Sequence, residues 1–193
     1  MASFNVIADV STTLQVVLHD ALVPLDPNFF VEVSDLQGNI TTAPLHLTLF
    51  LYEIVEDPSA RNRPHVRELV PPDVKIRKPP AALTLRYMMT PWSGDRITDH
   101  KIMGRVVQTL YDKAIIAGSD LQGGLAGTDA ALKVTMAPIT LEDRTRVWFS
   151  VQKAYRLSIN YEVRVINVDS ELVRGAGQVQ SRALVPHLPE EGP

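Results

Sequence analysis

The clearest pattern in this chain is an alternating apolar stretch that runs directly into a helical one. After the Pro79-Pro80 pair, every second residue is apolar, which is the period of one face of a β-strand. The alternating residues are Leu83, Leu85, Tyr87 and Met89. Beyond Trp92 the apolar spacing lengthens to three and four residues, as on one side of a helix, in a segment that carries Ile102, Met103, Gly104, Val106, Val107, Leu110 and Tyr111. The pattern predicts a strand followed by a helix.

Apolar periodicity predicts two further helices and several strands. The first helix has one face at Phe4, Ile7, Ser11, Leu14 and Leu18, with Ser3 as the candidate N-cap. Another begins at the capping residue Thr140 and continues its apolar face at Leu141, Trp148, Val151 and Tyr155. Alternation and β-prone composition predict strands at residues 29–33, 45–52, 132–136 and 159–165, with a further short strand at residues 179–185.

Two connections interrupt these elements. Residues 56–78 are rich in proline and mixed charge, a composition that predicts a long loop without a packed element. Residues 118–128 contain Gly123-Gly124 and Gly127 and are predicted to form a second flexible connection. Because the polar backbone of a long loop must be satisfied by solvent, by local turns or by a partner, residues 56–78 are a candidate partner-facing element.

Together these elements predict an α/β fold of the α+β type, a single mixed-sheet domain flanked by helices. Residues 1–170 are expected to form this domain, and residues 171–193 a C-terminal strand and a flexible tail. The chain has 193 residues, of which 45% are hydrophobic and 21% charged, so it is long enough to bury a core without disulfides.

Charge and cysteine content exclude several functional classes. A formal net charge of −3 gives no broad attraction for nucleic acid. Without cysteine the chain has no disulfide, no thiolate metal site and no cysteine nucleophile. The first residues lack a basic leader with a continuous apolar run, and no window reaches the roughly 18 apolar residues of a membrane helix. We therefore expect a cytoplasmic protein that contacts neither nucleic acid nor a membrane.

Catalytic and metal-binding motifs are absent from the sequence. The histidines, His19, His46, His65, His100 and His187, are scattered without the spacing of a helical metal site. Asp99-His100 is the most suggestive pair, but it lies at a predicted helix start, where an acidic residue complements the helix dipole. The glycines of residues 123–127 lack the lysine and hydroxyl residue of a phosphate-binding loop. We predict no catalytic residue, no cofactor and no bound metal.

Four residues are candidate contacts with partners or neighbouring subunits. Trp92 follows Pro91 at a predicted strand end, where packing over the end of the sheet is the favoured interpretation and an anchor for a neighbouring subunit is the alternative. Arg61-Asn62-Arg63 would ordinarily be solvated, but its charges suit the steering of a partner. Trp148 is not a candidate, because it lies on an apolar helix face and is expected in the core. The candidates are Arg61, Asn62, Arg63 and Trp92.

The order of these features resembles the cap, or tail terminator, proteins of phage-tail-like contractile injection systems. The resemblance covers residues 4–170, most of the chain. Its succession is an N-terminal helix, a Leu51-Tyr52 strand, an Arg61-Asn62 loop, the strand from Pro79 to Trp92, a helix around Gly104, and a tryptophan-bearing helix before the Tyr161-Glu162-Val163 strand.

The resemblance implies a structural protein, without catalytic activity, that closes the inner tube and anchors the last sheath layer. Its partners would be the sheath protein, the inner tube protein and further copies of itself in a hexameric ring, which requires a head-to-tail contact that closes. The resemblance also implies that an arm of the last sheath layer adds a strand to an exposed sheet edge of the cap. Assembly would take place in the cytoplasm, and release within an extracellular particle stays open.

Two other functions stay open at this point. A tail terminator or completion protein of a contractile bacteriophage would share the fold and the ring but would also meet a capsid connector. A small α/β enzyme that uses Asp99 and His100 is the alternative from a different class, and the missing catalytic constellation argues against it.

Overall fold

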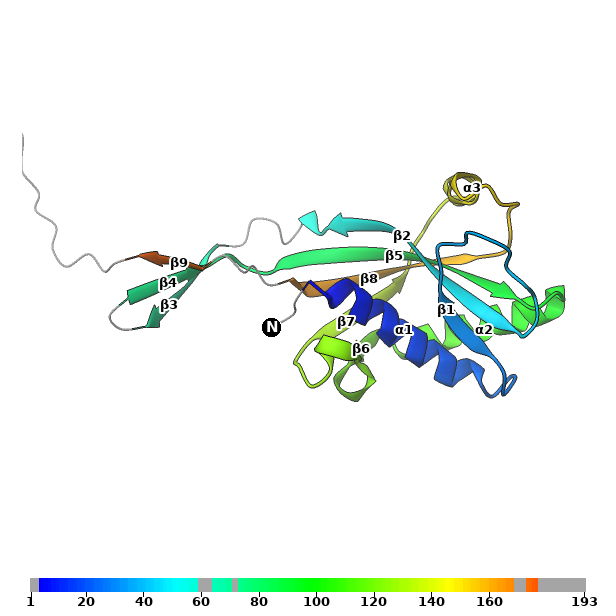
Figure 1. The fold of residues 1–193 in the computed structure, drawn as a ribbon, viewed down its shortest axis with the longest axis horizontal. Coiled ribbons are helices and arrows are strands. Elements are labelled where there is room, and N and C mark those ends of the chain that lie inside the picture. The colour runs from blue at the N-terminus through cyan, green and yellow to red at the C-terminus, as the bar shows by residue number, and fades with distance from the viewer. Residues whose placement is uncertain (1–3, 59–63, 71–72, 169–172, 177–193) are drawn as a thin grey trace, which may run out of the picture. The chain divides into compact units, whose positions relative to one another are not determined.

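A six-stranded mixed sheet forms the centre of the fold, in the order β1-β2-β5-β8-β7-β6 (Figure 1). The computed structural model describes residues 4–58, 64–70, 73–168 and 173–176. β1 runs parallel to β2, and the other neighbouring pairs of this sheet are antiparallel. The strands are β1 (Phe30–Val33), β2 (His46–Glu56), β5 (Ala81–Trp92), β8 (Ile159–Val168), β7 (Ala131–Met136) and β6 (Ile115–Ala117). The predicted mixed sheet is confirmed.

Helices lie on both faces of this sheet. α1 (Val6–Leu22) and α2 (Arg96–Asp112) cover one face, and α3 (Leu141–Ser150) lies on the other (Figure 1). We call the face toward α1 and α2 the inner face, and its apolar side chains form the main core with both helices. The face toward α3 is the outer face, where a smaller cluster surrounds Trp148. The architecture is α+β, as expected.

The alternation in β5 sends its side chains into both clusters. Leu85 and Tyr87, neither of which has any exposed surface, belong to the main core. Met88 and Trp92 belong instead to the cluster around Trp148. Burial of one large apolar side chain is worth about 1.5–3 kcal/mol, so a strand buried on both faces anchors the centre of the sheet.

Two helix starts follow from capping residues in the sequence. The carboxylate of Asp95 accepts a hydrogen bond from the backbone N–H of Thr98 at 2.8 Å, at the start of α2. At the start of α3, the hydroxyl of Thr140 accepts one from the backbone N–H of Asp143 at 3.1 Å. Each cap satisfies a backbone donor that the first helical turn leaves free. The strand-to-helix prediction and the Thr140 cap are confirmed.

Several residues predicted on apolar helix faces are exposed, among them Tyr111 of α2, which is 83% exposed. Phe4 precedes α1 and is 82% exposed, while the expected cap Ser3 lies outside the described residues. Leu141 is 64% exposed, and α3 ends at Ser150, which leaves Tyr155 in the following connection at 44% exposure. The predicted faces are wrong at these positions because each helix contacts the sheet over a shorter length than its apolar periodicity suggests.

Residues 118–128, predicted to be a flexible connection, instead pack against α1. They form two short 3₁₀ turns, η2 (Gly118–Asp120) and η3 (Gly123–Leu125). Leu121 and Leu125 are buried in the main core, and the backbone N–H of Gln122 donates to the hydroxyl of Thr13 in α1 at 3.0 Å. The two leucines explain the error, since their burial outweighs the flexibility of the surrounding glycines.

A second, three-stranded antiparallel sheet has the order β3-β4-β9. Its strands are β3 (Val66–Val70), β4 (Asp73–Arg77) and β9 (Val173–Ala176). Contacts divide the chain into two compact units, one of Met1–Asn62 with Pro80–Asp169 and one of Arg63–Pro79 with Ser170–Pro193.

The expected loop over residues 56–78 is therefore wrong in part, because β3 and β4 pair antiparallel within it and β2 continues to Glu56. The proline-rich composition of these residues favoured a loop, and the pairing of β4 with β9, far along the chain, could not be read from local sequence. The strand expected at residues 179–185 lies outside the described residues. The domain division at residue 170 stays a prediction.

Candidate assembly surface

β2 has β5 on one side, and along about half of its length no described strand pairs with its other side. β1 pairs with β2 from His46 to Leu49, after which the backbone N–H of Ser34 donates to the carbonyl of Leu49 at 3.0 Å. Residues 50–55 of β2 then have β5 on one side, and no strand of the described chain pairs with their other side. We call residues 50–55 the open β2 edge. An edge of this kind presents backbone N–H and C=O groups to an incoming strand.

The remaining edges of the six-stranded sheet are less suited to an added strand. On β1, the side-chain amide of Gln15 in α1 donates to the carbonyl of Val31 at 2.7 Å, which occupies a backbone group that a further strand would use. On the opposite side of the sheet, β6 is three residues long. Within the described sheet, the open β2 edge is therefore the longest stretch available for pairing.

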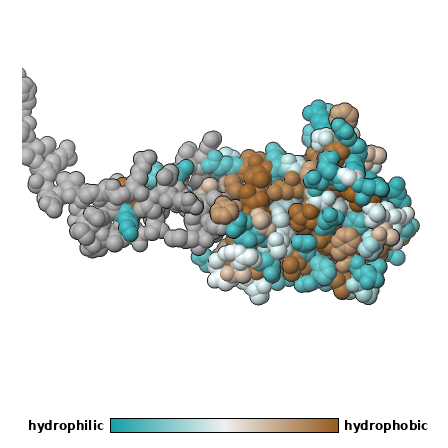
Figure 2. Space-filling model, viewed as in Figure 1, coloured by the Kyte–Doolittle hydropathy of each residue, from teal (hydrophilic) through white to brown (hydrophobic). Residues whose placement is uncertain are grey.

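A β-bulge lies near the start of the open β2 edge. The pairing of β2 with β5 shifts between Leu51 and Glu53, so that Tyr52 and Glu53 both line a pocket on the outer face. Burial raises the pKa of the Tyr52 hydroxyl above its ordinary value of 10.0. Ile54 pairs with Leu85 and is 49% exposed. Figure 2 shows apolar side chains gathered over the end of β2 and the neighbouring β5.

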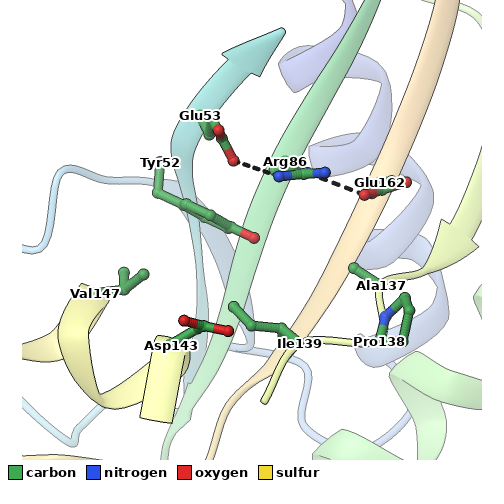
Figure 3. Close-up of a pocket in the computed structure, with 9 residues that line it drawn as sticks. All are labelled: Tyr52, Glu53, Arg86, Ala137, Pro138, Ile139, Asp143, Val147 and Glu162. Carbon is green, nitrogen blue, oxygen red and sulfur yellow. Dashed lines mark hydrogen bonds and ion pairs between the residues drawn. The ribbon is translucent and has the colours of Figure 1, made fainter. Parts of the chain in front are cut away.

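Three charged side chains cross the outer face in register (Figure 3). Arg86 of β5 lies between Glu53 of β2 and Glu162 of β8, with Nη1 at 2.7 Å from Glu53 Oε2 and Nε at 3.0 Å from Glu162 Oε1. The hydrogen bond to Glu53 is the main reason that the pKa of Arg86 is raised. We call this set the Glu53–Arg86–Glu162 ladder. It leaves a carboxylate, not a guanidinium, at the open β2 edge.

A cavity of about 400 Å³ lies beside the ladder. Tyr52 and the ladder form one wall, and Asp143 and Val147 of α3 form another (Figure 3). The connection before α3 completes the lining of the cavity with Ala137, Pro138 and Ile139. The cavity therefore has apolar sides and three carboxylates against one guanidinium. A cation with an apolar stem matches this lining better than an anion does.

Trp92, a predicted contact candidate, packs inside the chain at the end of the sheet. It is 5% exposed, its indole N–H donates to Thr48 Oγ1 at 3.0 Å, and the guanidinium carbon of Arg156 lies 4.2 Å from its ring centroid. His46 stacks near the same ring with 6.1 Å between the centroids. These contacts confirm the packing interpretation. The role of Trp92 as an anchor between subunits stays a prediction.

Arg61, Asn62 and Arg63 lie outside the described residues, so their role as contacts also stays a prediction. Asp99 and His100, which the sequence places together at a helix start, have different surroundings. Asp99 is 3% exposed, accepts a hydrogen bond from Ser93 Oγ at 2.7 Å and lies 3.6 Å from Arg156 Nη2, whereas His100 is exposed. Asp99 therefore links the start of α2 to the connection after α3.

Sequence reasoning missed the Glu53–Arg86–Glu162 ladder and the cavity beside it. Arg86 was the available signal, since it interrupts the apolar alternation of β5 with a charge on the opposite face. Its partners could not be assigned, because they lie 33 and 76 residues away along the chain.

The described residues offer neither a metal-binding cluster nor a membrane span. Among them, no group of three or more His, Cys, Asp or Glu side chains lies close enough to hold a metal ion. None of the helices in the described ranges has the length and apolarity needed to cross a membrane.

The mixed sheet, the three helices and the open β2 edge define an α+β domain suited to pairing with other chains. Residues 9–182 match the family model of the Pvc16 N-terminal domain, and the chain belongs to this family. Among curated protein sequences, none matches this chain.

Two solved structures share the fold. One is the sheath/tube terminator of PVC, an extracellular contractile injection system, in its extended state, with a TM-score of 0.68 and 19% sequence identity. The other is the tube-terminating cap of the anti-feeding prophage, with a TM-score of 0.55 and 17% identity. Each match covers 97% of this chain but 65% and 62% of the respective relatives, so this chain spans less than two thirds of their length.

Proposed function

We propose that this chain is a structural cap that closes the inner tube and anchors the last sheath layer of a contractile injection system. The observation that carries the proposal is the shared fold, which extends over 97% of the chain in a sheath/tube terminator and in a tube-terminating cap. Membership in the Pvc16 N-terminal domain family supports the same function. The cap would have no catalytic role.

A closing function requires copies of the chain to form a ring on the end of the tube. We propose a hexamer, in which each copy makes the same head-to-tail contact with the next. Single contacts of this kind can be weak in solution and become effective when several act together on a template. The purified chain is therefore expected to be monomeric and to assemble on the tube end.

Attachment of the sheath would use the open β2 edge. An extended arm of the last sheath layer, added beside residues 50–55, would gain main-chain hydrogen bonds with little demand on its side chains. The amide of Gln15 on β1 and the shortness of β6 favour β2 over the other edges. Assembly would take place in the cytoplasm, before any release of the particle.

Electron microscopy of particles made with and without this protein tests the proposal. Particles that lack it should have open or overlong tubes and poorly retained sheaths, and the wild-type gene supplied in trans should restore closed ends. Absence of the wild-type protein from intact, closed particles would contradict the cap function.

The candidate loop contact has its own test. Replacing Arg61 and Arg63 by glutamate should leave the monomer folded but reduce its incorporation into particles, as measured by quantitative mass spectrometry. Normal incorporation of this folded variant would exclude the arginines as a contact without affecting the cap proposal.

A further inference from the structure

The open β2 edge and the cavity beside it belong to one surface. Tyr52 and Glu53 are part of the edge strand and also line the cavity. A strand added beside residues 50–55 would place alternate side chains over the outer face, next to this cavity. The cavity is therefore positioned to accept a side chain of whichever chain pairs with the edge.

The ladder determines which charge that side chain should carry. Across the sheet the charges alternate from Glu162 to Arg86 to Glu53, each residue lying opposite the next. Opposite charges on neighbouring strands stabilise a sheet, whereas like charges directly opposite each other destabilise it. A basic residue opposite Glu53 would continue the alternation, and an acidic residue there would face Glu53.

The cavity lining supports the same choice. Glu53 and Arg86 are partly exposed, with 44% and 38% of their side-chain surfaces accessible, so Glu53 can be reached from outside the chain. The aliphatic stem of a lysine or arginine would lie against Tyr52 and Val147, with its charge toward Glu53 and Asp143.

We propose that the open β2 edge selects an extended partner segment that carries a lysine or arginine opposite Glu53, with the basic side chain seated in the cavity. This inference rests on the proposed function, in which that segment belongs to the sheath. It adds a requirement on the sequence of the partner, because main-chain pairing alone would accept a segment of any charge.

Charge reversal at Glu53 tests the proposal in assembled particles. Incorporation of each variant, measured by quantitative mass spectrometry, should fall about threefold for Glu53→Gln and at least about tenfold for Glu53→Lys, as expected for a lost and a reversed charge pair. Glu142→Lys is the matched control, because it reverses a glutamate that also pairs with an arginine at 2.7 Å but lies on α3 and does not line the cavity. Wild-type incorporation of a folded Glu53→Lys variant would overturn the proposal.

A crosslinking experiment keeps the test decisive if Glu53→Lys fails to fold. The chain has no cysteine, so Ile54→Cys provides a unique thiol for a short photoactivatable maleimide and leaves the ladder intact. Crosslinked peptides should come from an extended partner segment with a lysine or arginine within two residues of the attachment point. A segment without a basic residue, or the absence of any crosslink in particles that contain the labelled protein, would overturn the inference. Absence of wild-type protein from closed particles would instead overturn the cap function itself.

Discussion

The carboxylate of Asp9 in α1 occupies the space that a side chain at Gly123 would need. A Cβ atom at Gly123 would overlap with Oδ1 of Asp9, and one at Gly124 would lie 3.0 Å from Oδ2. The glycine-rich turn can lie against α1 because these positions have no side chain. Its glycines are therefore a packing requirement of the fold and not the mark of a flexible linker.

Gly123→Ala should destabilise the fold by about 1–3 kcal/mol, since it combines a steric overlap with an unfavourable backbone angle, φ +62°. Gly127→Ala is the control, because Gly127 has a similar φ of +72° but no atom within 4 Å of the point where a Cβ would lie. Chemical denaturation should give a larger loss for Gly123→Ala than for Gly127→Ala. Equal losses would mean that Asp9 moves away at little cost.

Trp148→Ala should lower the free energy of unfolding by about 3–5 kcal/mol, the usual cost of truncating a buried large aromatic side chain. Trp148 is 1% exposed, and its indole N–H donates to Ser158 Oγ at 3.3 Å. The neighbouring Phe149 is 83% exposed, so Phe149→Ala should change stability by less than about 0.5 kcal/mol. Similar unfolding curves for the two variants would contradict the burial of Trp148.

The sequence was most informative where structure is determined locally. The alternation from Leu83 to Met89 predicted β5, and the hydroxyl of Thr140 predicted the start of α3, because neither depends on distant residues. Pairing between distant segments was not predictable. The β3–β4–β9 sheet joins strands that no local period connects, and its proline-rich surroundings indicated a loop.

The dependence on pairing between distant segments also explains why the Glu53–Arg86–Glu162 ladder was not predicted. The Tyr52 bulge and the Glu53–Arg86–Glu162 ladder depend on the register of three strands, which one sequence does not fix. The sequence placed Asp99 and His100 together at a helix start. It did not indicate that one of them is buried beside Arg156 and the other exposed.

Asp99→Asn should cost about 2 kcal/mol of stability, because it removes the charge from a buried group that accepts a hydrogen bond and faces Arg156 at 3.6 Å. This is larger than the cost of losing an exposed helix-start interaction. The exposed neighbour gives the control, and His100→Ala should change stability by less than about 0.5 kcal/mol. Thermal unfolding at neutral pH measures the stability of both variants. An equal loss of stability for the two would mean that the contacts of Asp99 with Ser93 and Arg156 do not stabilise the fold.

The cap of α2 should make stability depend on pH in the acid range. Hydrogen bonds from the side chain and the backbone N–H of Thr98 lower the pKa of Asp95 below its ordinary value of 3.8. A carboxylate with a lowered pKa in the folded state contributes stability that is fully present above the unfolded pKa and is lost as the pH falls through the folded pKa.

Asp95→Asn keeps a side-chain oxygen at the N-cap but cannot titrate. This variant therefore distinguishes the contribution of the carboxylate charge to stability from that of the capping hydrogen bond. The melting temperature of the wild type should exceed that of Asp95→Asn at pH 6, and the difference should disappear as the pH falls below the folded pKa of Asp95. Asp95→Ala removes the cap as well and should melt below Asp95→Asn at every pH. A wild-type advantage over Asp95→Asn that persists unchanged at the lowest pH would show that the Asp95 carboxylate does not supply the acid-sensitive stability.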